Sequence, residues 1–180
     1  MGETLTLRER QAPLKQQYEA DPESAKLTIT VRSSTVGDEP TRCRISTDAA
    51  GGVEWEVGAH PMAGGAGDLA CSGDVLLASL AACQEITLRM VAAAMGIQLD
   101  EVEIAVHGDM DFRGTMGVDQ ETPVGFQRIR TDIRIVADAP EDRLQRLAQR
   151  AERYCVVAST LRQSPEMESS FKAERPTAPV

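Results

Sequence analysis

The sequence is poor in aromatic residues, in histidine and in positive charge. Only 3% of its 180 residues are aromatic and two are histidine, whereas 42% are hydrophobic. A chain of this length favours one domain, and its core must be built mainly from Leu, Ile, Val, Met and Ala. The net charge of -9 argues against a nucleic-acid partner, because neutralising phosphates requires clustered Lys and Arg.

The sequence also lacks an uninterrupted apolar run long enough to cross a bilayer. The best candidate, Val75 to Met95, contains Gln84, Glu85 and Arg89. The N-terminus has no apolar run, so the sequence shows no sign of a secretory signal. We therefore expect a cytoplasmic protein without a membrane or nucleic-acid partner, in a reducing compartment where structural disulfides are rare.

No two of the four cysteines form a Cys-x-x-Cys pair, which excludes a zinc ribbon and a thioredoxin-type motif. The spacings fit isolated thiols or one long-range pair. We interpret Cys43 and Cys71 as structural or incidental, although Cys71 lies close enough to the central helix to be a spare thiol. Cys83 and Cys155 lie in segments that are typical of packed helix.

The order of patterned segments predicts an α+β fold: strands, one helix, strands, then helices. A polar helical arm at 7–20 is expected to be interrupted by Pro13. Alternating β-branched residues predict strands at 26–33, 42–47, 52–57, 101–107 and 128–135, and a final short strand at 167–173. The domain is expected at 25–173, between an arm or tail at 1–24 and a disordered tail at 174–180.

The longest expected helix follows a Gly-rich loop and ends at Met95. Asp74 is suited to cap its N-terminus, and Gly96 is suited to stop it. Apolar residues on more than one face predict that this helix is central and mostly buried. A last helical region begins near Pro140 and contains Cys155.

Two cysteines in packed helices can be small hydrophobic residues without chemistry. If the fold brings Cys83 and Cys155 together, they become a two-electron redox couple. A thiolate attacks the peroxide oxygen and becomes a sulfenic acid, and the second thiol then converts it to a disulfide. Because a free cysteine is only a few per cent thiolate at neutral pH, a nearby cation is needed to lower its pKa.

The two histidines offer a different chemistry. His60 precedes Pro61 in the Gly-rich loop, and His107 ends an expected strand. A cysteine-dependent hydrolase or transferase would pair Cys83 with one of them, but no oxyanion motif accompanies either histidine. The glycines of the loop do not follow a strand, so the sequence does not indicate a nucleotide-binding cradle.

The segment from Leu76 to Arg89, preceded by the Gly-rich loop, resembles the central helix of the OsmC/Ohr family. These are osmotically inducible and organic hydroperoxide resistance proteins. The segment from Leu99 to His107 resembles the strand that follows, and Tyr154-Cys155-Val156-Val157 resembles the second cysteine motif, usually Cys-Pro. The likeness covers roughly residues 25 to 172 and indicates a divergent OsmC-like branch.

The resemblance implies an intertwined homodimer in which two antiparallel sheets surround a long central helix. It implies a peroxidase that reduces organic hydroperoxides in oxidative stress defence, with Cys83 as the peroxidatic and Cys155 as the resolving thiol. It also implies an external dithiol or lipoyl reductant, with no metal or bound cofactor. The alternative within this fold is a non-enzymatic domain that binds a small apolar ligand in the dimer cleft.

One departure concerns the carboxylate. Family members carry Pro-Glu at the start of the central helix, and that glutamate helps to position an arginine. This sequence has Ser72-Gly73 there, followed by Asp74. Asp74, one place later, and Glu85, two residues after Cys83, are the candidate replacements.

The activating arginine of the family comes from an early loop. Arg42 lies at about the corresponding distance before the central helix, and Arg44 is its neighbour. Arg113, in a loop typical of the divergent branch, is a rival for the same role. Val156 replaces the proline of the second cysteine motif, which predicts a different start for the last helix.

Overall fold

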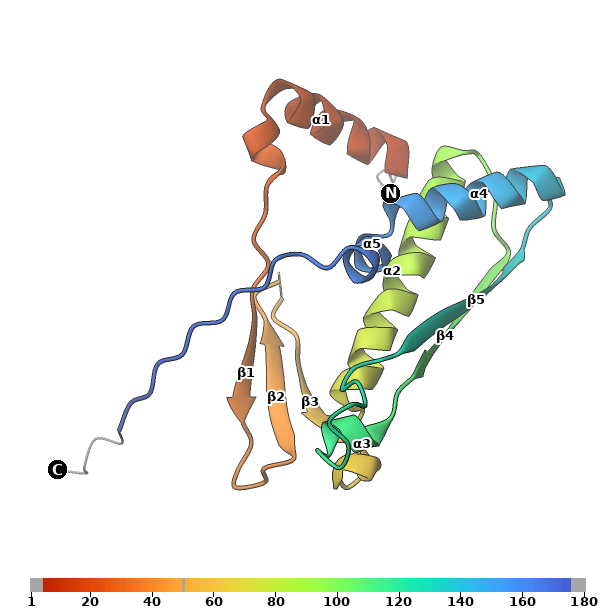
Figure 1. Ribbon diagram of the computed structural model, residues 1–180. Helices are drawn as coiled ribbons and strands as arrows, with labels where there is room; N and C mark the ends of the chain where they lie inside the picture. Colours follow the sequence, from red (N-terminus) through yellow and green to blue (C-terminus); the bar gives the residue numbers. More distant parts are fainter. Residues whose placement is uncertain (1–4, 50, 176–180) are drawn as a thin grey trace.

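The computed structural model describes residues 5–49 and 51–175. A long helix, α2 (Ser72–Ala94), runs between two separate antiparallel sheets (Figure 1). The first sheet has the order β1 (Val31–Thr35), β2 (Arg42–Thr47), β3 (Glu54–Gly58), and the second pairs β4 (Glu101–Asp109) with β5 (Arg128–Val136). The α+β class and the two sheets around a central helix are thereby confirmed.

The first sheet contains the expected hairpin, in which Ile45 lies opposite Trp55. Gly51 and Gly52 take positive φ values of 96° and 49° in its turn, a conformation that favours glycine. β1 begins at Val31, so the strand predicted from residue 26 was too long. The reason is pairing, because Val31 already lies opposite Thr47, the last residue of β2.

The N-terminal arm forms α1 (Leu7–Ala20), followed by a short 3-10 helix, η1 (Pro22–Ala25). The Thr6 amide donates to the Glu9 carboxylate at 2.7 Å, and the two residues form a capping box. The helix continues through Pro13, so the predicted interruption was wrong. Proline fixes φ near the helical value. Because α1 has no buried residue, a bend at Pro13 would disturb no core packing.

α2 is capped differently from the prediction. Cys71 is its N-cap, and Asp74 is the third helical residue. The Cys71 amide donates to the Asp74 carboxylate at 2.8 Å, and the Asp74 amide donates to the Cys71 sulfur at 3.5 Å. The helix ends at Ala94, and Gly96 takes a φ of 63° just beyond it, as the sequence predicted.

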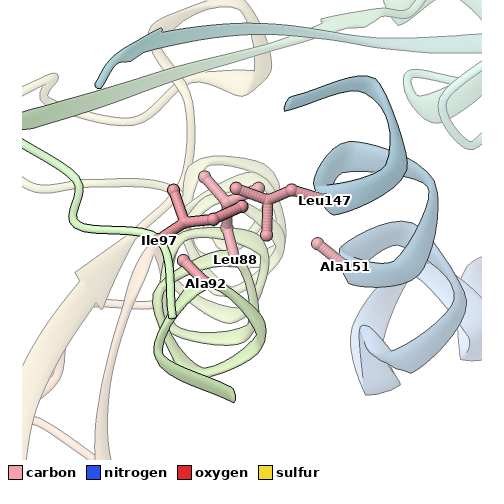
Figure 2. Packing of buried hydrophobic residues seen from close by; sticks show 5 residues of the cluster. All are labelled: Leu88, Ala92, Ile97, Leu147 and Ala151. Carbon is pink, nitrogen blue, oxygen red and sulfur yellow. The ribbon is translucent and has the colours of Figure 1, made fainter. Parts of the chain in front are cut away.

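Two hydrophobic clusters attach α2 to the C-terminal half of the chain. Figure 2 shows the larger one, which is made by Leu88, Ala92, Ile97, Leu147 and Ala151. The other contains Leu80, Cys155 and Ala158. Together with β4, these contacts cover one side of the helix.

The opposite side of α2 is open in the single chain, since 59% of Ile86 and 38% of Met90 are exposed. The prediction that this helix is mostly buried was therefore wrong for one chain. The periodicity identified its apolar faces correctly, but only one of them has a partner within the chain.

By length and composition, α2 would also suit a membrane span, and it is the one helix in the described part of the chain that does. Glu85 and Arg89 do not prevent this, contrary to the sequence prediction. The core helix of a soluble protein passes the same test. α2 packs against α4 (Glu141–Tyr154), α5 (Val156–Arg162) and β4.

The last helical region is divided at Cys155, whose φ and ψ of -73° and 109° end α4 and begin α5. Cys155 thus lies at a junction rather than within a helix. A single-turn helix, α3 (Phe112–Thr115), lies in the loop between β4 and β5. The strand predicted at 167–173 does not form, because no strand pairs with it; Met167 and Phe171 are 84% and 93% exposed.

Candidate active site

Cys83 and Cys155, 72 residues apart in the sequence, lie side by side in the structure. Cys83 projects from the middle of α2, and Cys155 is the N-cap of α5. Both belong to the smaller hydrophobic cluster, and the two thiols interact directly. Cys155 is completely buried, whereas Cys83 is partly exposed. The fold therefore creates the long-range thiol pair that the spacing alone left open.

The surroundings of Cys83 favour its thiolate. Burial raises the pKa of this thiol, but polar contacts outweigh that effect and lower it below the ordinary value. The contributing groups are the Val157 amide, the Cys155 thiol, the Thr87 hydroxyl and the Val156 amide. The two amides belong to the first turn of α5, where amides have no partner within the helix. They are free to face a negative sulfur.

Cys155 has the opposite tendency. Burial raises the pKa of its thiol, and the neighbouring Cys83 raises it further. The Ala158 amide donates to its sulfur at 3.5 Å, which only partly offsets these effects. The arrangement therefore favours ionisation of the more accessible sulfur, that of Cys83, before that of Cys155. This is the division of roles that a nucleophile and a resolving thiol require.

The predicted activating arginine lies elsewhere within the chain. Arg42 forms an ion pair with Asp68, with 2.6 Å between Nη2 and Oδ2. It lies opposite Gly58, which bridges to Cys71 at the start of α2. Cys83 is about 18 Å further along that helix at 1.5 Å per residue. Within residues 5–49 and 51–175, no hydrogen bond joins an arginine to Cys83.

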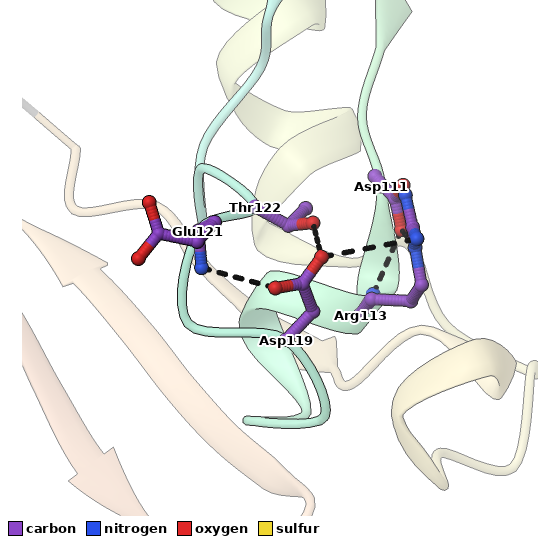
Figure 3. Close-up of polar contacts among 5 residues, drawn as sticks. All are labelled: Asp111, Arg113, Asp119, Glu121 and Thr122. Carbon is purple, nitrogen blue, oxygen red and sulfur yellow. Dashed lines mark hydrogen bonds and ion pairs between the residues drawn. The ribbon is translucent and has the colours of Figure 1, made fainter.

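The two rival arginines are also engaged. Arg44 pairs with Glu56 across the first sheet at 3.1 Å. Arg113 donates to Asp111 and lies 3.8 Å from Asp119, so two carboxylates neutralise it in its own loop (Figure 3). Neither arginine contacts the thiol pair.

The candidate carboxylates have local partners as well. Glu85 pairs with Arg89 one turn further along α2, at 3.5 Å. Asp74 serves the capping box, and the pKa of its carboxyl is lowered by the amide and thiol of Cys71. Instead, Asp68 is the carboxylate that holds Arg42, and the Arg42 hydrogen bond lowers the pKa of the Asp68 carboxyl.

Neither histidine lies beside Cys83. The His60 ring stacks on Phe112 with 5.0 Å between centroids, and its Nδ1 accepts from the Met62 amide at 3.1 Å. It lines a pocket of about 410 Å³ at the start of α2, together with Cys71 and Asp74. His107 pairs with Asp132 at 3.3 Å on the face of β4 that turns away from α2.

A larger pocket of about 850 Å³ lies next to the thiol pair. It is lined by Thr87 and Val156, both of which contact Cys83, and by apolar residues of α2. Neither cysteine is among the residues that line it. No group of three or more metal-ligating side chains occurs within the described ranges of the chain.

Three contributors were not predicted from the sequence: one lies beside Arg42, and the other two lie beside Cys83. Asp68 is one acidic residue in a glycine-rich loop, and nothing in its spacing pointed to Arg42. Thr87 had a signal, because it lies four residues after Cys83 and therefore on the same face of α2. The amides of α5 had one too, since valine in place of proline at position 156 retains an N–H donor.

The fold and the thiol pair define an α+β protein with a two-cysteine centre. A sequence model of the family described as OsmC-like protein matches residues 65–170. The chain therefore belongs to the OsmC-like protein family, and the expected family is confirmed. A comparison with curated protein sequences gives no match.

Solved structures show the same fold at low sequence identity. An OsmC-like protein from Mycoplasma pneumoniae is 18% identical, with a TM-score of 0.63 over 77% of this chain and 90% of the other. An OsmC-like protein of unknown function from Vibrio cholerae is 11% identical, with a TM-score of 0.61 over 75% and 94%. An organic hydroperoxide resistance protein from Elizabethkingia anophelis is 18% identical, with a TM-score of 0.56 over 77% and 91%.

Proposed function

We propose that this protein is a thiol-dependent peroxidase that reduces organic hydroperoxides and serves oxidative stress defence. The observation that carries the proposal is the contact between Cys83 and Cys155, with the pKa of the first lowered and that of the second raised. Relatives of the same fold include organic hydroperoxide resistance proteins. The chain's own geometry supplies the rest of the argument.

The reaction takes place in three steps. The Cys83 thiolate attacks the distal peroxide oxygen; the O–O bond breaks, the alkoxide takes a proton and leaves as an alcohol, and Cys83 becomes a sulfenic acid. The Cys155 sulfur then displaces hydroxide from Cys83, so that water and a disulfide form. An external dithiol or lipoyl group reduces this disulfide by exchange and is itself oxidised, so the cycle requires neither a metal nor a bound cofactor.

The missing cation is supplied, we infer, by a second copy of the chain. Arg42 with its partner Asp68 is too far along α2 to reach Cys83 of the same chain. A homodimer in which two α2 helices meet can place the Arg42–Asp68 pair of one copy beside Cys83 of the other. In this arrangement Asp68 takes the place of the helix-start glutamate that the family carries.

Two uncovered surfaces support the homodimer. One is the open side of α2 that carries Ile86 and Met90. The other is the sheet β1–β3, which makes no more than marginal contact with any helix of its own chain (Figure 1). A three-stranded sheet needs a packed face for stability, and a second copy provides it. The free cysteines suit a reducing compartment such as the cytoplasm.

Peroxide titration of the reduced protein tests the proposal. One equivalent of cumene hydroperoxide should produce a disulfide between Cys83 and Cys155, identified by peptide mass mapping under non-reducing conditions. Cys83→Ser should prevent it, and Cys43→Ser should not. If peroxide oxidises Cys43 or Cys71 at the same rate as Cys83, the thiol pair has no special reactivity and the proposal fails.

One observation favours the non-enzymatic alternative, a domain that binds a small apolar ligand. The pocket of about 850 Å³ near Cys83 is larger than a small peroxide requires, and no arginine in the described part of the chain forms a hydrogen bond with the thiol. In that case the reduced protein would bind apolar molecules but consume no peroxide.

A further inference from the structure

A further pocket, which we call the glutamine pocket, lies on the side of α2 that faces away from its open side. Its volume is about 390 Å³, and α2, β5, α4 and α5 all contribute to its lining. Gln84 lines it, whereas Ile86, two residues later on the open side, is rotated by about 200° around the helix axis. The pocket is formed within one chain, and neither Cys83 nor Cys155 lines it.

The glutamine pocket is a gap between the two hydrophobic clusters. Ile129 of β5 packs against the smaller cluster, and Ile135 packs against the larger one. Ile133 lies between them on the same face of the strand, because side chains two residues apart share a face. It belongs to neither cluster and lines the pocket, with 43% of the residue exposed. The fold thus leaves one large apolar side chain of an inward-facing row uncovered.

Gln84 is the polar group on the opposite wall. Leu80 and Leu88, one turn before and one turn after it, are 4% and 1% exposed, so Gln84 lies on the buried face of α2. Its amide oxygen is buried and has no hydrogen-bond partner in the part of the chain that the structure describes. A buried acceptor without a donor is unfavourable and rare in native proteins. Rotation about the terminal torsion of glutamine is soft, so the oxygen can turn toward the pocket.

The charges at the entrance of the pocket cancel. Arg162 of α5 forms an ion pair with Glu152 of α4, and more than half of each side chain is exposed. These are the two charged residues of the lining within residues 5–49 and 51–175. A charged ligand would have to break this pair or enter without a counter-charge, so the lining favours a neutral one.

We propose that the glutamine pocket binds a neutral, mainly apolar small molecule that donates one N–H or O–H hydrogen bond to Gln84. The apolar body of the ligand covers Ile133, and its donor satisfies the Gln84 amide oxygen. One molecule thus meets both of the needs that the fold leaves in the same pocket. The volume lies at the small end of the range of about 300–1,000 Å³ for ligand pockets, which suits a bicyclic ring. The site goes beyond the proposed peroxidase function, because it requires neither thiol.

Indole and benzothiophene isolate the donor, because the two bicyclic rings have nearly the same shape and only indole carries an N–H. Titration followed by methyl NMR should give a dissociation constant roughly three- to tenfold lower for indole, as expected for one neutral hydrogen bond. Gln84→Met removes the acceptor and keeps the length of the side chain, so it should abolish this preference. The variant should fold at least as stably, since it replaces an unpaired buried acceptor by an apolar group. Gln145→Met, at a glutamine of α4 outside the pocket lining, should retain the preference.

The same spectra show where the probes bind. Indole should shift the methyl signals of Ile129 and Ile133, which line the pocket, and should leave those of Ile86 on the open side of α2 unchanged. Shifts at Ile86 alone, equal affinities for the two probes, or an unchanged preference in Gln84→Met would overturn the inference. So would a failure of both probes to bind, because the pocket would then hold only water.

Discussion

Helix α2 carries two cysteines in contrasting surroundings. Cys71 caps its first turn in a pocket with His60 and Asp74, and its sulfur is used as a hydrogen-bond acceptor by the helix backbone. Cys83 lies about three turns further on, against Cys155 and the first amides of α5. The helix-start pocket contains the residue types of a cysteine–histidine site, yet the polar groups there stabilise the helix. The same residue type therefore caps a helix at one position and faces a second thiol at the other.

The largest difference between the two cysteines should appear on their removal. Cys83→Ser should reduce consumption of organic hydroperoxide to the uncatalysed background, because a hydroxyl does not form the nucleophilic thiolate. Cys71→Ser should retain the activity, since serine is a good N-cap. The measurement is peroxide consumption with a dithiol as reductant. Equal loss of activity in both variants would mean that the helix-start pocket takes part in the chemistry.

Removal of Cys155, the proposed resolving thiol, should have a smaller and distinctive effect. Cys155→Ser should still react once with peroxide, because the Cys83 thiolate remains, but the sulfenic acid should persist instead of becoming a disulfide. Trapping with dimedone and mass analysis should show the adduct on Cys83 only. The Cys155→Ser variant should also be inactivated by excess peroxide, because a persistent sulfenic acid on Cys83 is oxidised further. An adduct on Cys71 would contradict the assignment.

Loss of the helix cap should affect stability rather than reactivity. Asp74→Ala removes the carboxylate that accepts from the Cys71 amide, and we expect a decrease of about 1 kcal/mol in the free energy of unfolding. Urea denaturation measures this change. Asp74→Asn is the matched control, because its amide oxygen can still accept. A large decrease in peroxide turnover in folded Asp74→Ala would give Asp74 a role at the thiol pair.

The smallest expected effect concerns the amides of α5. Val156→Pro removes one donor that faces Cys83, whereas proline is well tolerated at the first position of a helix. Cys155 already has the extended conformation that precedes proline. Loss of a weak hydrogen bond of about 0.5 kcal/mol should lower the alkylation rate of Cys83 at neutral pH roughly two- to threefold.

The pH profile of alkylation gives the sign of this effect. The lowered pKa of Cys83 means that its thiolate is present at a lower pH than in free cysteine, so its rate should reach a plateau at a lower pH. Val156→Pro should shift the profile toward higher pH, and Val156→Ala, which keeps the amide, should not. A shift in the alanine variant as well would point to packing instead of hydrogen bonding.

Local sequence patterns predicted the strands well, whereas pairing and burial depend on distant segments of the chain. Alternation placed β2, β4 and β5 to within two residues at each end, because the side-chain period of a strand is visible in the sequence. The strand expected from residue 26 was too long, and the one at 167–173 does not form, because a strand exists only where another chain segment pairs with it. The open side of α2 was missed for a related reason, since an apolar face does not reveal which chain covers it.

The sequence by itself determined the α+β class, the long central helix and the two segments that carry Cys83 and Cys155. It also determined the valine that leaves an amide at the start of α5. Only the tertiary structure decided that the two thiols meet, that Arg42 pairs with Asp68, and that both histidines lie away from Cys83. Periodicity and capping depend on neighbours a few residues apart, whereas contacts across tens of residues depend on how the whole chain packs.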